Sequence, residues 1–251
     1  MSFIPLSVVI ITRNEEANIE RCIRSVQGLT LDIIVVDSGS TDKTTALAEK
    51  MGARVFPLPW GGYSKQKNFG NSKSKYDYIF SLDADEALSP ELCDELRKLF
   101  LAGNLKPLYK VNRFNHYCNK PIRHGSWYPD WHYCLFDKTI LHWLETDDVH
   151  ESLSWNASTP RGTLKSVLLH YTTRSELQYA KKMEKYARLF AVKMHAKGKS
   201  AGIIKAYSSA IFRFYKEYIL QLGFLDGTAG FKIARAHFIY TRNKYLYLRD
   251  M

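Results

Sequence analysis

The chain has 251 residues, of which 45% are apolar and 24% charged, and its formal net charge is +11. This size and composition are typical of a globular protein with one large α/β domain, alone or with an added module, and exclude a largely disordered chain. No apolar run reaches the roughly 18 residues that a membrane-spanning helix needs, and four widely spaced cysteines make no disulfide scaffold, so we expect a reduced, cytoplasmic protein.

The first hundred residues alternate between apolar, β-branched runs and segments with helical spacing. Nearly unbroken β-branched runs are typical of strands that are buried on both faces of a parallel sheet. The first run, residues 3–11, lacks a basic leader and precedes Arg13, so we interpret it as a strand and not as a signal peptide. Short connections between the elements predict a doubly wound α/β sheet with right-handed crossovers. The expected strands are 6–12, 32–36, 53–56 and 78–82, and the expected helices are 16–26, 43–51, 64–72 and one beginning near Pro90.

Polar, carboxylate-bearing turns follow three of these four strands. Ligands of such sheets bind at the carboxyl ends of the strands, where these turns meet. Three carboxylates within four residues repel one another unless a cation lies among them, and oxygen ligands suit Mg²⁺ or Mn²⁺ better than Zn²⁺. The alternative is an acidic turn with Glu86 and Ser89 near a helix start. The turns are Asn14-Glu15 after the first strand, Asp37 at the end of the second, and Asp83-Ala84-Asp85-Glu86 after the fourth.

Residues 108–169 are rich in β-prone and aromatic residues. Any single aromatic residue there is most simply a core residue. As a group in the second half of a catalytic domain, they would suit the apolar faces of sugars.

Residues 171–251 carry all the excess positive charge, with 16 Lys and Arg against 5 Asp and Glu, whereas residues 1–170 hold 20 of each. The pattern predicts helices at 175–199, 203–222 and 231–246, with a break at 223–227. Aromatic and basic residues on the amphipathic middle helix favour contact with an anionic membrane surface. The alternative is a helix packed on the α/β domain with a solvated basic edge. No nucleic-acid-binding module is evident, so we do not expect nucleic acid as a partner.

Several segments of the chain resemble the family 2 inverting glycosyltransferases, which have the GT-A fold. Later segments are similar to the bacterial branch that includes the lipopolysaccharide inner-core β-1,4-glucosyltransferases. The resemblance implies a Rossmann-like, mainly parallel sheet that binds the donor (1–104), a mixed-sheet acceptor half (105–172) and a basic helical region (173–251). The first set of segments is 8–15, 36–42 and 83–86, and the second is 125–130, 135–137, 149–151 and 223–227.

The resemblance also implies roles for individual residues in binding a UDP-sugar. Asp37 would bind the uracil or ribose, Asp83 the ribose or the water shell of a metal, and Asp85 would ligate the Mg²⁺ or Mn²⁺ that bridges the diphosphate. Further contacts with the nucleotide or donor would come from Thr12, Asn14, Glu15, Gln66, Lys67 and Asn68.

The acceptor hydroxyl needs a carboxylate or histidine within hydrogen-bond reach to take its proton. We favour Glu151 in the segment Val149-His150-Glu151, with His150 as a metal or phosphate contact. This segment departs from family members that use an Asp in a Glu-Asp pair, so the other candidates stay open. They are Asp130, Asp147, Asp148 and His150.

The resulting hypothesis is a metal-dependent, inverting transfer of a hexose, such as glucose, from a UDP-sugar to a lipopolysaccharide-core or other lipid-linked acceptor. The enzyme would be cytoplasmic and peripheral on the inner face of the plasma membrane. A sugar nucleotidyltransferase is an alternative, but it should carry a Gly- and Lys/Arg-rich loop after the first strand, which Thr12-Arg13-Asn14-Glu15 is not. A non-catalytic nucleotide-sugar- or carbohydrate-binding protein is another, and the intact Asp37, Asp83 and Asp85 argue against it.

Overall fold

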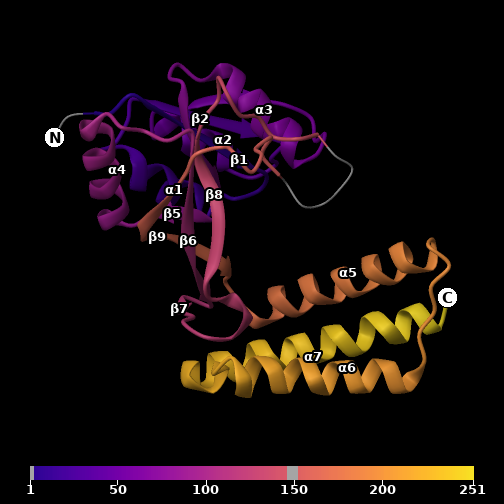
Figure 1. Cartoon of the computed structure of the whole chain (residues 1–251). Helices are drawn as coiled ribbons and strands as arrows, with labels where there is room; N and C mark the ends of the chain where they lie inside the picture. The colour runs from indigo at the N-terminus through magenta and orange to yellow at the C-terminus, as the bar shows by residue number, and fades with distance from the viewer. Residues whose placement is uncertain (1–2, 146–151) are drawn as a thin grey trace. The chain divides into compact units, whose positions relative to one another are not determined.

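The computed structural model describes residues 3–145 and 152–251. The chain forms two compact units (Figure 1), which we call the sheet unit (residues 1–113 and 131–170) and the helical unit (residues 114–130 and 171–251). Compactness does not show which residues bind donor or acceptor, so the expected functional division at 104/105 and 172/173 stays a prediction.

The sheet unit confirms the expected alternation of strands and helices. Its sheet has the strand order β3-β2-β1-β4-β8-β6-β9-β5 in the described part of the chain. The β1–β2, β1–β4 and β2–β3 pairs are parallel, whereas β8 is antiparallel to β4. The elements that lie wholly or mainly in this unit are β1 (Leu6–Thr12), α1 (Ile19–Val26), β2 (Asp32–Asp37), α2 (Thr44–Lys50), β3 (Arg54–Pro57), α3 (Tyr63–Lys73), β4 (Tyr78–Asp83), β5 (Glu86–Leu88), α4 (Pro90–Ala102), β6 (Leu108–Tyr117), β8 (Asp130–Asp137) and β9 (Arg161–Thr173).

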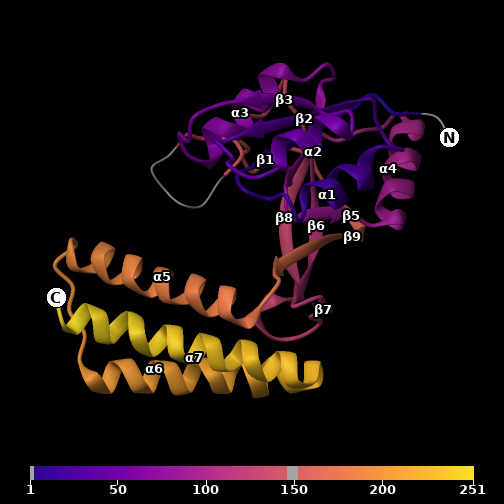
Figure 2. The same cartoon turned by 180° about the vertical axis from the view of Figure 1, so that it is seen from behind.

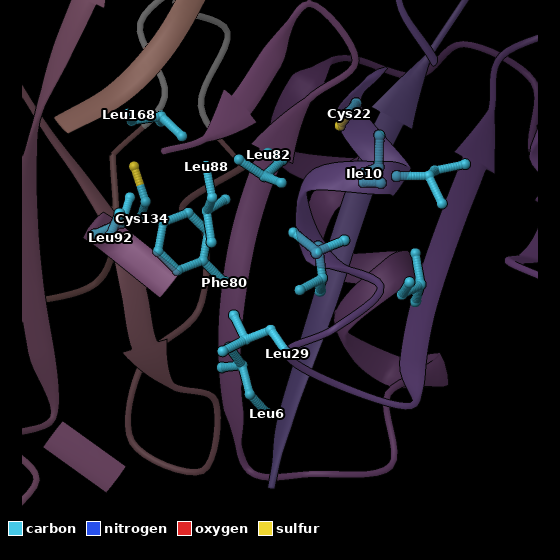
Figure 3. Packing of buried hydrophobic residues seen from close by; sticks show 14 of the residues in the cluster. Leu6, Ile10, Cys22, Leu29, Phe80, Leu82, Leu88, Leu92, Cys134 and Leu168 are labelled. Carbon is cyan, nitrogen blue, oxygen red and sulfur yellow. The ribbon is translucent and has the colours of Figure 1, made fainter. Parts of the chain in front are cut away.

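The central strands are apolar without interruption because both of their faces are covered. Val8 and Ile10 of β1 belong to one buried cluster, whereas Val9 and Ile11 belong to another. Side chains alternate between the faces of a strand, so these two clusters lie on opposite sides of the sheet. Figure 3 shows the first cluster, in which Phe80 of β4 packs among aliphatic side chains.

Strand β5 was not expected. Glu86 pairs with His170 at the start of an antiparallel ladder between β5 and β9, so Glu86 does not begin a helix. The helix starts instead at Pro90, where the Ser89 Oγ accepts a hydrogen bond from the Leu92 N–H at 3.1 Å. A three-residue strand whose partner residues lie eighty or more positions away leaves no local signal in the sequence.

The helical unit contains three long helices, with α7 lying between α5 and α6 in both views (Figures 1 and 2). The expectation that the last helix begins at Phe231 was wrong, because α7 begins at Gly227 and so includes a Gly-Thr-Ala-Gly segment without apolar periodicity. The expected helix 203–222 ends its α-helical part at Tyr215 and continues as a π-helical turn. The elements are β7 (Lys120–Pro121), α5 (Glu176–His195), α6 (Ile203–Tyr215), α7 (Gly227–Arg249), the π turn Lys216–Leu220 and the 3₁₀ turns Gly125–Trp127 and Gly223–Asp226.

Among the described helices, none is long and apolar enough to cross a membrane. The four cysteines are free thiols, of which Cys22, Cys93 and Cys134 are buried and Cys118 is half-buried.

Candidate functional site

The strand register brings three of the expected site residues to one edge of the sheet. Thr12 at the end of β1 lies opposite Asp37 of β2, and Ile11 lies opposite Asp83 of β4. Because these strands are parallel, their carboxyl ends meet at this edge. The Oγ1 of Thr12 is buried there without a hydrogen-bond partner in the described residues.

Asn14 and Glu15 connect the loops that follow β1 and β2. Asn14 has a positive φ of 56°, and its Oδ1 accepts a hydrogen bond from the Thr41 N–H at 2.8 Å. The N–H groups of Asn14 and Glu15 donate to Ser40 Oγ and Thr44 Oγ1, each at 2.8 Å. These contacts fix the shape of the expected nucleotide side of the site.

Asp37 shapes the turn after β2. Its Oδ2 accepts hydrogen bonds from the N–H groups of Gly39 and Ser40 at 3.0 and 2.9 Å, and its Oδ1 accepts one from Ser40 Oγ. Gly39 has a φ of 84°, a conformation that favours glycine. The carboxylate is therefore held rigidly at the sheet edge, and a ligand would share it with this turn.

Helix α3 carries three expected donor contacts with different surroundings. The Gln66 Nε2 donates to the carbonyl of Pro59 at 2.9 Å, while its Oε1 is buried without a hydrogen-bond partner among the described residues. Lys67 is buried, with its Nζ 3.4 Å from Asp83 Oδ1 and 4.8 Å from the centre of the Trp143 ring. The Asn68 amide instead holds the backbone of Trp143, donating to its carbonyl at 2.8 Å and accepting from its N–H at 2.9 Å.

The acidic segment after β4 separates into three distinct carboxylates. Asp83 faces Lys67 and has 36% of its side chain exposed. Asp85 Oδ2 lies 3.3 Å from His170 Nε2 of β9. Glu86 is buried, accepts a hydrogen bond from the Asp83 N–H at 2.9 Å and lies 3.4 Å from Arg113. Glu86 therefore braces the turn that presents the other two carboxylates.

The charges in this cluster shift one another's protonation equilibria. Burial raises the pKa of the Glu86 carboxyl and the Asp83 carboxylate raises it further, although His170 and Arg113 oppose this. Burial alone would lower the pKa of His170, but the hydrogen bond to Asp85 and the charges of Asp85 and Glu86 outweigh burial and raise it. The raised pKa of Glu86 favours its neutral form and the raised pKa of His170 favours its charged form, so each carboxylate of this segment faces a basic side chain.

Arg113 and His170 were not among the residues expected at the site. Arg113 lies on β6 and His170 on β9, and in this part of the chain we expected roles only for aromatic side chains and for the candidates for the catalytic base. His170 directly follows the apolar run Val167-Leu168-Leu169, and a polar residue at the end of such a run was the available signal. Arg113 had no comparable signal, because its carboxylate partner Glu86 is distant in the sequence.

A cavity of about 430 Å³ opens beside these charged groups in the sheet unit. Two cations, two carboxylates and several aromatic rings line it, as a pocket for a sugar and a diphosphate requires. In the described residues, Ser81 Oγ, Asp83 Oδ1 and Trp143 Nε1 are buried and lack hydrogen-bond partners. Polar groups of this kind normally have a partner, so these atoms are positioned for a ligand. The lining is Lys67, Ser81, Asp83, Glu86, Arg113, Trp131, His132, Tyr133, Cys134, Trp143, Ser152, Leu153 and Trp155.

Asp83 and Asp85 fit a divalent cation that takes most of its ligands from elsewhere. The described residues contain no group of three or more His, Cys, Asp or Glu side chains that could hold a metal by themselves. Mg²⁺ is commonly bound by one or two carboxylates together with substrate phosphates and water. Asp83, whose Oδ1 makes no hydrogen bond in the described residues and lies 3.4 Å from Lys67 Nζ, and the neighbouring Asp85 supply such a pair.

Of the candidates for the catalytic base, the structure describes only Asp130. Glu151, His150, Asp147 and Asp148 lie outside the described residues. Asp130 belongs to the helical unit, where its Oδ2 accepts a hydrogen bond from Asn115 Nδ2 at 3.1 Å.

Residues 7–149 match the family model described as Glycosyl transferase family 2. A Rickettsia bellii protein described as an uncharacterized glycosyltransferase is 34% identical over 236 residues, which are 90% of this chain and 80% of that protein. The lipopolysaccharide core biosynthesis glycosyltransferase LpsC of Rhizobium meliloti is 39% identical over 106 residues, 40% of this chain and 39% of that protein. Glucosyl-3-phosphoglycerate synthase of Mycobacterium tuberculosis, solved with Mn²⁺ and UDP-glucose, has a TM-score of 0.38 and 29% identity, covering 45% of this chain and 44% of that one.

Proposed function

The chain belongs to glycosyl transferase family 2, and on this premise we propose that it transfers a hexose, such as glucose, from a UDP-sugar with inversion and with the help of a divalent metal. The acceptor in this proposal is a lipopolysaccharide-core sugar or another lipid-linked glycan. The family assignment makes it a glycosyltransferase, and the donor, the acceptor and the stereochemistry are our inference.

The observation that carries the proposal is the cavity at the carboxyl end of β4. It combines the cations Lys67 and Arg113 with the carboxylate of Asp83 and with the rings of Trp131 and Trp155. The cations would balance the charge of a diphosphate, and the rings would pack against the C–H faces of sugars. Dinucleotide chemistry would need a glycine-rich loop after β1, where the chain has Thr12-Arg13-Asn14-Glu15.

In the proposed reaction an acceptor oxygen forms a bond to the anomeric carbon while the bond from that carbon to the β-phosphate oxygen of UDP breaks. The proton of the acceptor hydroxyl passes to the base, for which Glu151 is our choice and Asp130, Asp147, Asp148 and His150 are the alternatives. UDP leaves with the electron pair, and Lys67 and Arg113 would stabilise its charge. A metal held by Asp85 and Asp83 would act as a Lewis acid toward the departing diphosphate.

On the nucleotide side, Asp37 would bind the uracil or ribose, beside Thr12 and Gln66, whose partnerless buried oxygens support contact with the donor. Asn14, Glu15 and Asn68 would act mainly by holding the loops and Trp143 in place, because they bond to the protein itself.

The proposed acceptor is supported by the similarity to LpsC, whose description places it in lipopolysaccharide core biosynthesis. The excess of basic residues in positions 171–251 supports a peripheral attachment to the inner, anionic face of the plasma membrane. A cytoplasmic location is part of the same proposal.

The test is release of UDP from UDP-glucose and other UDP-sugars, with and without Mn²⁺, alongside thermal unfolding in the same solutions. We expect slow, Mn²⁺-dependent release of UDP, and a higher unfolding temperature with the correct donor. Stabilisation without any release of UDP, even with acceptor glycans, would indicate a binding protein and contradict the proposal. Glu151→Gln should abolish transfer and keep UDP binding, whereas normal transfer by this variant would move the base to Asp130 or another candidate.

A further inference from the structure

A groove in the helical unit lies over α7 and between α5 and α6. Figures 1 and 2 show α7 as the middle helix of the three. The groove encloses about 600 Å³ and belongs entirely to this unit. Its lining is Met183 and Tyr186 from α5, Ser209, Phe212, Arg213 and Lys216 from α6 and the turn that follows it, and His237, Tyr240, Thr241 and Lys244 from α7.

Three cations line the groove, and no carboxylate is among its lining residues in the described part of the chain. Arg213, Lys216 and Lys244 are among its lining residues. In the described part of the chain, neither lysine forms an ion pair with a carboxylate. Lys244 Nζ lies instead 4.6 to 5.1 Å from the centres of three rings, those of Phe190, Tyr240 and Tyr245. Aromatic faces stabilise a cation without neutralising its charge.

A buried carboxylate, Glu217, contacts two of the residues that line the groove and is already paired. Glu217 Oε2 lies 2.6 Å from His237 Nδ1 and 3.5 Å from Arg213 Nε, and its Oε1 accepts a hydrogen bond from Ser126. These contacts account for the charge of Arg213 and leave the two lysines without a counterion in the described residues. Burial, Arg213 and Lys205 together lower the pKa of Lys244, which is the expected effect of a cation held among other cations.

The rim of the groove is apolar and exposed. Phe212 is 62% exposed and Tyr186 42%, and both also line the groove. Ile211, the residue before Phe212 in α6, is 60% exposed but is not among the lining residues. A small soluble anion would use the lysines but not these side chains. An amphiphile with a phosphate head and acyl chains would use both.

We propose that the groove binds an anionic phospholipid headgroup at a membrane surface, with Lys216 and Lys244 supplying positive charge along the groove for the phosphate and Phe212 and Tyr186 lying at the level of the acyl chains. The site is distinct from the cavity of the sheet unit and does not depend on the proposed transferase reaction. The excess of basic residues in positions 171–251 would by itself predict only a non-specific attraction to anionic membranes, whereas this proposal assigns the binding to particular residues.

The experiment is co-sedimentation of the full chain with phosphatidylcholine vesicles that contain or lack phosphatidylglycerol. The test variant is Lys216→Gln with Lys244→Gln. The matched control is Lys181→Gln with Lys182→Gln, which removes the same charge from exposed positions of α5 outside the groove. We expect the groove variant to lose at least about tenfold in affinity for the anionic vesicles, and the control to lose less than about threefold.

Equal losses in both variants would show a diffuse electrostatic attraction and overturn the site. Absence of vesicle binding by the unsubstituted chain, together with stabilisation by inorganic phosphate that depends on Lys244, would make the ligand a soluble phosphate and contradict the lipid. Each variant is checked by thermal unfolding and by UDP release, and both should be unchanged. If the unsubstituted chain released no UDP, that result would contradict the proposed function but would not bear on this site.

Discussion

The two units of the chain differ in whether their buried polar side-chain atoms have hydrogen-bond partners. In the described residues, every buried side-chain N or O atom that lacks a hydrogen-bond partner belongs to the sheet unit, and several of them lie at its cavity. The helical unit pairs its buried polar groups, as in the series Tyr179–His237–Glu217–Ser126. The difference indicates a site in the sheet unit that a ligand completes, and a helical unit completed by its own side chains except for the lysines of its groove.

The largest effect that we expect is on the rate of UDP release, and it tests whether a ligand completes the site of the sheet unit. Asp83→Asn and Asp85→Asn should each lower Mn²⁺-dependent UDP release by about 10²–10³-fold, because each removes a negative charge proposed to hold the metal and orient the diphosphate. Steady-state rates at saturating donor measure this. Asp94→Asn, the same change at an exposed position of α4, should leave the rate within about twofold. A normal rate in both Asp83 and Asp85 variants would place the chemistry elsewhere.

The next largest effect concerns one glycine in each unit, Gly70 and Gly230, at which an added Cβ would clash with neighbouring atoms. A Cβ on Gly230 would lie 1.9 Å from the backbone oxygen of Gly223, whereas one on Gly70 would lie 2.3 Å from a methyl group of Val9. Backbone cannot move aside as a side chain can, so Gly230→Ala should cost about 3 kcal/mol and Gly70→Ala about 1–2 kcal/mol of unfolding free energy. Denaturant unfolding measures both. Gly202→Ala, with open space around it, should stay within about 0.5 kcal/mol, and a smaller cost at Gly230 than at Gly70 would contradict the argument.

We expect Asp32, the first residue of β2, to make the stability of the folded chain depend on pH. Burial by itself raises the pKa of Asp32, but hydrogen bonds from the Lys75 N–H and Ser7 Oγ, together with Arg54, outweigh it and lower the pKa. The unfolded chain therefore binds the proton more tightly than the folded chain. The stability that Asp32 contributes is complete above the unfolded value of about 3.9 and is lost as the pH falls through the lower, folded value.

Asp32→Asn should accordingly reduce stability at neutral pH and weaken its decline below pH about 4, as followed by denaturant unfolding across pH. UDP release should persist, because Asp32 begins β2 while the proposed site lies at the other end of the strand. An unaltered pH dependence would show that Asp32 is not a source of the acid sensitivity.

The smallest expected effect concerns Lys244. Because its pKa is lowered in the folded chain, the charged lysine opposes folding at neutral pH. Lys244→Met should therefore leave the unfolding free energy unchanged or raise it by up to about 1 kcal/mol, and the gain should shrink as the pH approaches about 10.4. Lys181→Met, at an exposed position, provides the baseline in the same thermal unfolding experiment. Clear destabilisation by Lys244→Met alone would show that the lysine is a structural element of the helical unit.

The sequence alone determined the parts of this protein that local patterns encode. Unbroken β-branched runs predicted β1 and β2, and the carboxylate-bearing turns after the strands predicted that their side chains gather at one edge of the sheet, because a parallel sheet brings those ends together. The motifs at 8–15, 36–42 and 83–86 identified the family, which the family model confirms.

Only the tertiary structure decided how the acidic segment is divided among roles. Glu86 is buried and supports the turn because β5 pairs with β9. Asp85 pairs with His170 and Asp83 with Lys67, and both partners come from other elements of the chain. The groove of the helical unit likewise joins lysines on α7 and on the turn after α6. Such pairings depend on register and on crossing helices, to which many weak contacts contribute at once. A local pattern of residue types therefore cannot specify them.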